Sequence, residues 1–176
     1  MEKEKLDSVR HSLSHLLAAA TRELYPGSQN AIGPAVDNGF YQDFEMSKQI
    51  SDTDLLKIEA KMRELLPKWK EWTKKIVTLE EVRKEFGWNK YKIELAEEFA
   101  EHEKTLTFFT CGGFIDLCKG GHNLPPAEID PKSFKLDRIA GAYWHGDEKN
   151  KMLTRIYGLA FETKKELDAY MAQREE

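Results

Sequence analysis

Cysteine is scarce in this sequence of 176 residues, which contains only Cys111 and Cys118. Two cysteines cannot form the disulfide network that stabilises many small secreted domains. The sequence also lacks an apolar run of the roughly 20 residues that a bilayer-crossing helix needs, and its charged start, MEKEKLD, leads into no secretory apolar segment. We therefore expect a cytoplasmic protein with no membrane partner, in which both thiols stay reduced and can bind metal.

An excess of basic charge is also absent, because 27 Lys and Arg residues face 31 Asp and Glu residues, for a net charge of −4. Proteins that bind nucleic acid over much of their surface are usually basic, so any RNA contact should be local. The sequence has no internal repeat and no linker rich in Pro, Gly or Ser. We therefore interpret residues 1–176 as a single domain.

Helical and strand patterns are interspersed along the chain. Apolar residues recur at helical spacing over residues 6–25, and again from a capping box at Ser51 to residue 75, with an interruption at Pro67. Short helices are expected over residues 80–86 and 163–176. The rest is expected to be mainly strands, paired as hairpins: 31–44, 105–118 and 138–161. This mixture predicts an α+β fold, with an antiparallel sheet packed against a long N-terminal helix and further helices.

The segment HSLSH places His11 and His15 four residues apart on the first predicted helix. They lie about 40° apart around the helix axis, nearly opposite the leucine stripe, among small residues. That position predicts a cleft wall rather than the main packing face. Two histidines at this spacing can bind one metal ion, although the pair alone is also common on helix surfaces.

The segment FIDLCKGGH could complete a site with these histidines. Strand alternation places Phe114, Asp116 and Cys118 on one face, and the glycines that follow let His122 return to the same place. His11, His15, Cys118 and His122 could form a tetrahedral zinc set, or a catalytic zinc with three of them and a water. Without metal, the same groups could hold a water by hydrogen bonds.

Ordered blocks extend over nearly the whole chain: RHSLSHLLAAA, AIGPAVDNGFYQDF, YKIEL, FIDLCKGGH, AGAYWHGDEKNKMLTRIYGLAF and TKKELDAYM. In this order they resemble the editing region of threonyl-tRNA synthetases, the second additional domain, which is related to alanyl-tRNA synthetase editing domains. The resemblance implies an aminoacyl-tRNA deacylase that hydrolyses seryl-tRNA(Thr), with the tRNA 3′ end carrying serine as its partner. Serine lacks one methyl group of threonine, and because that changes binding by only about 1–3 kcal/mol, a second, hydrolytic site is needed.

The resemblance also implies roles for individual residues. His11 and Lys92 would be catalytic: they would activate the attacking water and stabilise the oxyanion. The implied substrate-binding residues are His15, Gln42, Asp116, Cys118 and His122. Asp116 would bind the α-amino group, although Asp116 and Lys92 could instead form a structural ion pair. Gln42 and Gly121 depart from the family pattern, in which tyrosine and proline are common at these positions.

The chain lacks the ATP-binding and amino-acid-activating motifs of a class II synthetase core. The resemblance therefore implies that ATP and the catalytic zinc belong to an absent synthetic domain, toward which the helix over residues 163–176 would lead. Hydrolysis would require no cofactor, while zinc could bind at the His/Cys quartet. Two alternatives are a zinc-stabilised tRNA-binding module without catalysis and a freestanding trans-editing deacylase of alanyl type.

Overall fold

The computed structural model describes residues 3–122 and 124–175, so residues 1, 2, 123 and 176 of the predicted domain lie outside it. Its helices are α1 (Lys3–Leu24), α2 (Asp52–Leu65), α3 (Leu79–Glu85), α4 (Lys90–Glu101) and α5 (Lys164–Glu175). Its strands are β1 (Gln29–Asn30), β2 (Ala35–Val36), β3 (Gly39–Glu45), β4 (Thr73–Val77), β5 (Leu106–Cys111), β6 (Phe114–Leu117), β7 (Phe134–Tyr143) and β8 (Met152–Ala160). The predicted α+β fold is confirmed.

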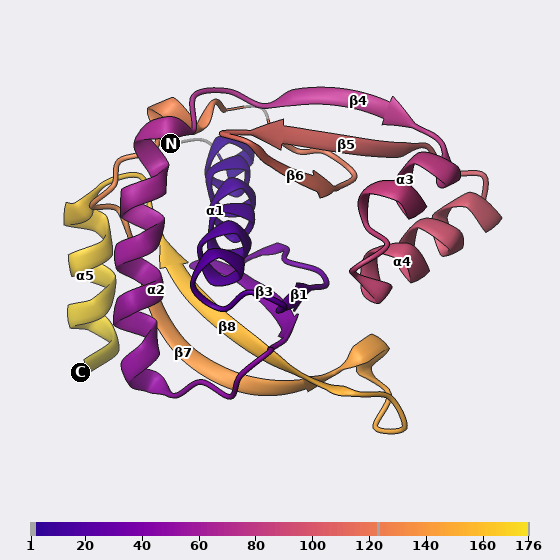
Figure 1. The fold of residues 1–176 in the computed structure, drawn as a ribbon. Helices are drawn as coiled ribbons and strands as arrows, with labels where there is room; N and C mark the ends of the chain where they lie inside the picture. Colours follow the sequence, from indigo (N-terminus) through magenta and orange to yellow (C-terminus); the bar gives the residue numbers. More distant parts are fainter. Residues whose placement is uncertain (1–2, 123, 176) are drawn as a thin grey trace.

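Two antiparallel sheets enclose the N-terminal helix (Figure 1). One has five strands in the order β1-β3-β8-β7, with β2 also paired to β3, and it curves past one side of α1. The other has three strands, β4-β5-β6, and lies on the opposite side of α1. Each predicted hairpin is present, and the β7–β8 pair carries a register shift between Leu136 and Arg138.

Helix α1 is buried on more than its leucine stripe. The stripe packs with α2 and the five-stranded sheet into the main core, while Ser8 and Ser12 on another face are also buried. The hydroxyl of Ser8 accepts the backbone N–H of Leu124, so the chain after β6 covers this face. His15 lies off the leucine stripe, as expected, but it is buried, with an exposed fraction of only 4%.

The prediction that the second helix continues to residue 75 is wrong. Pro67 lies in a 3₁₀ turn, Leu66–Lys68, after which the chain becomes extended. It then forms β4, which pairs along its length with β5, from Thr73 opposite Thr110 to Val77 opposite Leu106. These inter-strand hydrogen bonds satisfy backbone groups that a helix would otherwise satisfy, so tertiary pairing decides the conformation of this segment.

Helix α4 replaces the strand structure expected after residue 86. The side chain of Asn89 starts this helix by accepting the backbone N–H groups of Tyr91 and Lys92. A second core forms where α3 and α4 cover the three-stranded sheet, and it includes Val82, Phe86, Ala96, Leu106, Phe108 and Leu117. Helix α4 therefore lies beside β6 and brings Lys92 toward it. Among the described residues, none of the helices has the length and apolar character needed to span a bilayer.

Candidate active site

A cleft of about 370 Å³ lies at the meeting of α1, the chain from β1 to β3, α4 and the end of β6. Its lining includes every predicted site residue except His122, namely His11, His15, Gln42, Lys92, Asp116 and Cys118. His122 is close by, since its ring centroid lies 4.4 Å from that of His11. The structure thus brings the two histidine-bearing segments of the sequence together at one place.

Asp116 is the centre of a buried polar network. Its carboxylate accepts hydrogen bonds from His15 Nδ1 (2.8 Å), Asn30 Nδ2 (3.2 Å) and the backbone N–H of Leu117 (2.9 Å). Lys92 Nζ forms an ion pair with it at 2.9 Å. Burial alone would raise the pKa of Asp116, but the charge of Lys92 and the hydrogen bond from His15 hold it well below its usual range. Asp116 is therefore a carboxylate whose oxygens are already engaged.

His15 has one ring nitrogen held and one available. Nδ1 bonds to Asp116, whereas Nε2 is buried and has no hydrogen-bond partner among the described residues. Burial lowers the pKa of His15, but the opposing effects of Asp116 and Cys118 are larger together and raise it to about 9. The contact between Asp116 and Nδ1 fixes the orientation of the ring, and it therefore also fixes the direction in which Nε2 points.

Cys118 lies among the remaining histidines. Its Sγ is 3.3 Å from His11 Nε2 and 3.4 Å from His122 Nε2, and it accepts the backbone N–H of Gly120 at 3.4 Å. Burial opposes ionisation of the thiol, but the hydrogen bonds to His11 and His122 and the nearby charge of His15 lower its pKa to about 3. Burial, together with the neighbouring histidines, lowers the pKa of His122 to about 4. Cys118 is therefore a thiolate at neutral pH, next to a neutral His122.

Ser12 and Trp72 orient His122, and no local pattern in the sequence indicates this role for either residue. Trp72 donates its indole N–H to Ser12 Oγ (2.9 Å), which lies 3.3 Å from His122 Nδ1. The Trp72 and His122 ring centroids are 4.5 Å apart. Because an indole can only donate, Ser12 accepts from Trp72 and can direct its own hydrogen to His122.

Gln42, on β3, lines the cleft and bonds to helix α1. Its Nε2 donates to the backbone oxygen of Ser14 (3.1 Å), while its Oε1 is buried and has no partner among the described residues. Tyrosine, the residue expected at this position from the family pattern, could not offer such an amide oxygen. Gln42 therefore presents an acceptor that a ligand in the cleft could use.

The donor set fits a zinc ion. His11, His15, Cys118 and His122 each place one ligand atom within 4.8 Å of the others. With bonds of about 2.0–2.3 Å, the ligand atoms of tetrahedral zinc lie about 3.3–3.7 Å apart. The separations from Cys118 Sγ to Nε2 of His11 and of His122, 3.3 and 3.4 Å, lie in this range. The Asp116–His15 contact and the free Nε2 of His15 also match the carboxylate–histidine pairs that orient zinc ligands.

Comparison with known proteins gives one consistent result. No family model matches the chain. It is 46% identical, over 98% of its length, to the threonine–tRNA ligase of Borrelia hermsii (strain HS1 / DAH). It is 46% and 45% identical, over 95% of its length, to those of Borreliella afzelii (strain PKo) and Borreliella burgdorferi (strain ZS7). The chain spans only about 30% of the length of these relatives. The chain is thus homologous, over nearly its whole length, to a segment of threonine–tRNA ligases, which confirms the resemblance that its ordered blocks indicated.

Proposed function

We propose that this chain is the editing domain of a threonyl-tRNA synthetase and hydrolyses the ester linking serine to tRNA(Thr). The supporting observation is the single cleft that joins His11, Lys92, Asp116 and Cys118, in a chain whose relatives are named threonine–tRNA ligases. Residues 1–176 act as one domain, and α5 leads toward a synthetic domain that supplies ATP binding. The chain by itself does not charge tRNA.

In this proposal His11 holds the attacking water and accepts a proton from it. His11 lines the cleft, and an imidazole is suited to proton transfer near neutral pH. The water oxygen attacks the ester carbonyl carbon, and the C–O bond to the tRNA 3′ end then breaks. The departing ribose oxygen takes the proton back from His11, so the products are free serine and tRNA with a 3′-terminal hydroxyl.

Lys92 stabilises the negative charge that develops on the carbonyl oxygen. Its ammonium lines the cleft and is held by Asp116 rather than by solvent, so it needs little reorganisation during the reaction. The structural ion pair and the catalytic role are therefore compatible.

Direct binding of the substrate α-amino group by Asp116 stays a prediction. The oxygens of Asp116 already accept from His15, Asn30, Lys92 and the Leu117 backbone. Gln42 Oε1, by contrast, is a buried acceptor without a protein partner and lines the same cleft. We propose that Gln42 accepts from the serine ammonium, and that Asp116 stabilises this charge from behind.

The His/Cys quartet favours a second candidate, a zinc-stabilised tRNA-binding module without catalysis. A zinc ion held by His11, His15, Cys118 and His122 would act as a Lewis acid if one position stayed open to water, or as a folding staple if all four ligands were bound. Stoichiometric zinc, unfolding on chelation and no deacylation would support the second candidate. In the first candidate, by contrast, His11 and Lys92 act directly in hydrolysis.

The test is a deacylation panel of seryl-, threonyl- and other aminoacyl-tRNAs, with and without chelator. Preferential loss of the seryl ester from tRNA(Thr) is expected, and no such preference at any protein concentration would overturn the proposal. A preference for another aminoacyl-tRNA would indicate an alanyl-type trans-editing enzyme instead.

Variants assign the roles within that panel. His11→Ala and Lys92→Ala should each lower the rate by at least about 100-fold, the usual contribution of general acid–base or oxyanion groups. His102→Ala and Lys90→Ala remove the same side-chain types at exposed positions and should leave the rate unchanged. Circular dichroism verifies folding, and unaltered rates in both site variants would remove His11 and Lys92 from the mechanism.

A further inference from the structure

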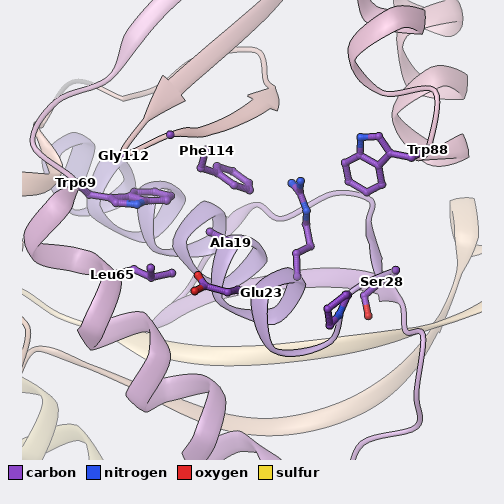
Figure 2. A pocket seen from close by; sticks show the side chains of 12 residues that line it. Ala19, Glu23, Ser28, Leu65, Trp69, Trp88, Gly112 and Phe114 are labelled. Carbon is purple, nitrogen blue, oxygen red and sulfur yellow. The ribbon is translucent and has the colours of Figure 1, made fainter.

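A second cavity, of about 440 Å³, shares no lining residue with the candidate catalytic cleft. Figure 2 shows the side chains that line it. It is formed by the last turn of α1, the loop after it, the end of α2, the β5–β6 turn and Trp88. Phe114 lines this cavity, and its ring centroid lies 6.2 Å from that of His15, which lines the other one. The proposed hydrolysis makes no use of this space.

Arg22 carries an unsatisfied positive charge in the cavity. Its guanidinium carbon lies 4.4 Å from the ring centroid of Trp88 and 5.1 Å from that of Phe114. Its Nη1 is buried without a hydrogen-bond partner, and no carboxylate pairs with it among the described residues. The two rings cover the faces of the guanidinium but cannot accept its in-plane N–H groups. Arg22 therefore lacks an acceptor, and an anionic one suits it best.

The other charges around the cavity do not supply that acceptor. Glu23 lines the cavity with a side chain that is 53% exposed, and its carboxylate lies 3.6 Å from Lys61, which also pairs with Glu64 at 2.8 Å. Glu85 and Asp116 act on Arg22 only through longer-range attraction, and Asp116 is already engaged in the catalytic cleft. Arg22 is thus a lining cation that has no direct acceptor among the described residues.

The β5–β6 turn leaves open space beside Arg22. Gly113 has a φ of +83°, and a Cβ there would meet no atom within 4 Å. Gly112 has a φ of +56°, and a Cβ there would lie 2.4 Å from the Trp69 indole. A turn of two glycines therefore packs closely on Trp69 and keeps one side of the cavity free of side chains.

We propose that this cavity is a nucleotide-binding site, in which Arg22 donates to a phosphate and the base lies against Trp88. A guanidinium fork matches two phosphate oxygens, which a single ammonium does not. Trp88 is 43% exposed, so part of its indole surface is available to a planar base. The volume is within the range of small-molecule sites. The phosphate can belong to a free mononucleotide or to RNA, and binding requires no hydrolysis.

Isothermal titration calorimetry on the full chain tests this site with AMP, adenosine and inorganic phosphate as probes. AMP should bind, and Arg22→Gln should weaken it at least tenfold, because a hydrogen bond to a charged group is lost. Arg22→Lys should bind AMP less tightly than the unaltered chain. Arg83→Gln, which removes an exposed arginine paired with Glu97, is the matched control and should change nothing. Thermal unfolding verifies that each variant is folded.

The probes separate the parts of the proposal. Adenosine binding as tightly as AMP, or AMP binding that Arg22→Gln leaves intact, would overturn it, as would the absence of binding by AMP. Arg22-dependent binding of inorganic phosphate supports the anion contact, and Trp88→Ala should weaken AMP more than phosphate. Competition of a tRNA acceptor-stem minihelix with AMP would identify RNA as the source of the phosphate. Because no ester is present, these results stand apart from the outcome of the deacylation panel.

Discussion

Replacement of Asp116 by asparagine should destabilise the fold strongly, because it leaves a buried cation without its counter-charge. Lys92 is 3% exposed and Asp116 is completely buried, with their charged atoms 2.9 Å apart. Removal of one member of a buried ion pair typically costs about 3–5 kcal/mol, since the remaining charge cannot return to water. Asp116→Asn preserves the shape of the side chain, so most of the loss should come from charge rather than packing.

A double-mutant cycle separates this effect from other losses. Lys92→Met removes the buried charge while keeping an unbranched side chain of similar length. The double variant should be more stable than the sum of the single losses predicts, by about 1–3 kcal/mol. Urea unfolding at pH 7 with chelator, followed by tryptophan fluorescence, gives each free energy of unfolding.

An exposed ion pair provides the control. Lys164 and Asp168 pair on α5, with side chains 59% and 58% exposed. Asp168→Asn should change the free energy of unfolding by less than about 0.5 kcal/mol. If Asp116→Asn cost as little as Asp168→Asn, or if the cycle showed no coupling, the assignment of a desolvated Lys92–Asp116 pair would be refuted.

Three further variants test neighbouring features by the same unfolding assay. Although burial opposes it, Asp116 and Cys118 raise the pKa of His15 to about 9. Protonated His15 should therefore contribute about 3 kcal/mol of stability, which is complete below about pH 6.5 and is lost as the pH rises through 9. The difference in free energy of unfolding between the unaltered chain and His15→Gln should be larger at pH 6 than at pH 9.5, and an equal difference would contradict the assignment. Trp72→Phe removes the donor to Ser12 and should cost about 1 kcal/mol, whereas no change would mean that the hydroxyl finds another partner. Gly112→Ala should cost more than Gly113→Ala, because only the former meets Trp69, and the reverse order would contradict the packing of the turn.

Much of the fold could be predicted from local pattern. The Asp37-Asn38-Gly39 turn forms as expected between β2 and β3, with Asn38 at a φ of +67°, and the capping box at Ser51 starts α2. Strand alternation also placed Asp116 and Cys118 on one face, so the meeting of the two histidine-bearing segments could be predicted. These features depend on neighbours within a few residues, which a sequence displays directly.

Other features depended on distant partners. Strand β4 is exposed along most of its length, with lysines in its centre, and only its pairing with β5 makes it a strand. Helix α4 is different, because after its cap Asn89 the apolar residues Tyr91, Leu95 and Phe99 recur at helical spacing, so the sequence could have predicted it. Ser12 and Trp72 meet 60 residues apart in the sequence, and no local pattern reports that contact. The contact of Ser12 and Trp72 that orients His122 could therefore not be predicted, whereas the four residues of the His/Cys quartet could.

The sequence separation across the candidate active-site cleft has a consequence during protein synthesis. His11 meets Cys118 across 107 residues, and His15 meets Asp116 across 101. Helix α1 leaves the ribosome well before its site partners, which lie more than 100 residues later in the sequence, and long-range contacts of this kind form slowly. A nascent or truncated chain that ends before β6 therefore carries the HSLSH segment without a site. Any hydrolytic or metal-binding capacity arises only in chains that have passed this point, so prematurely ended products should be inert.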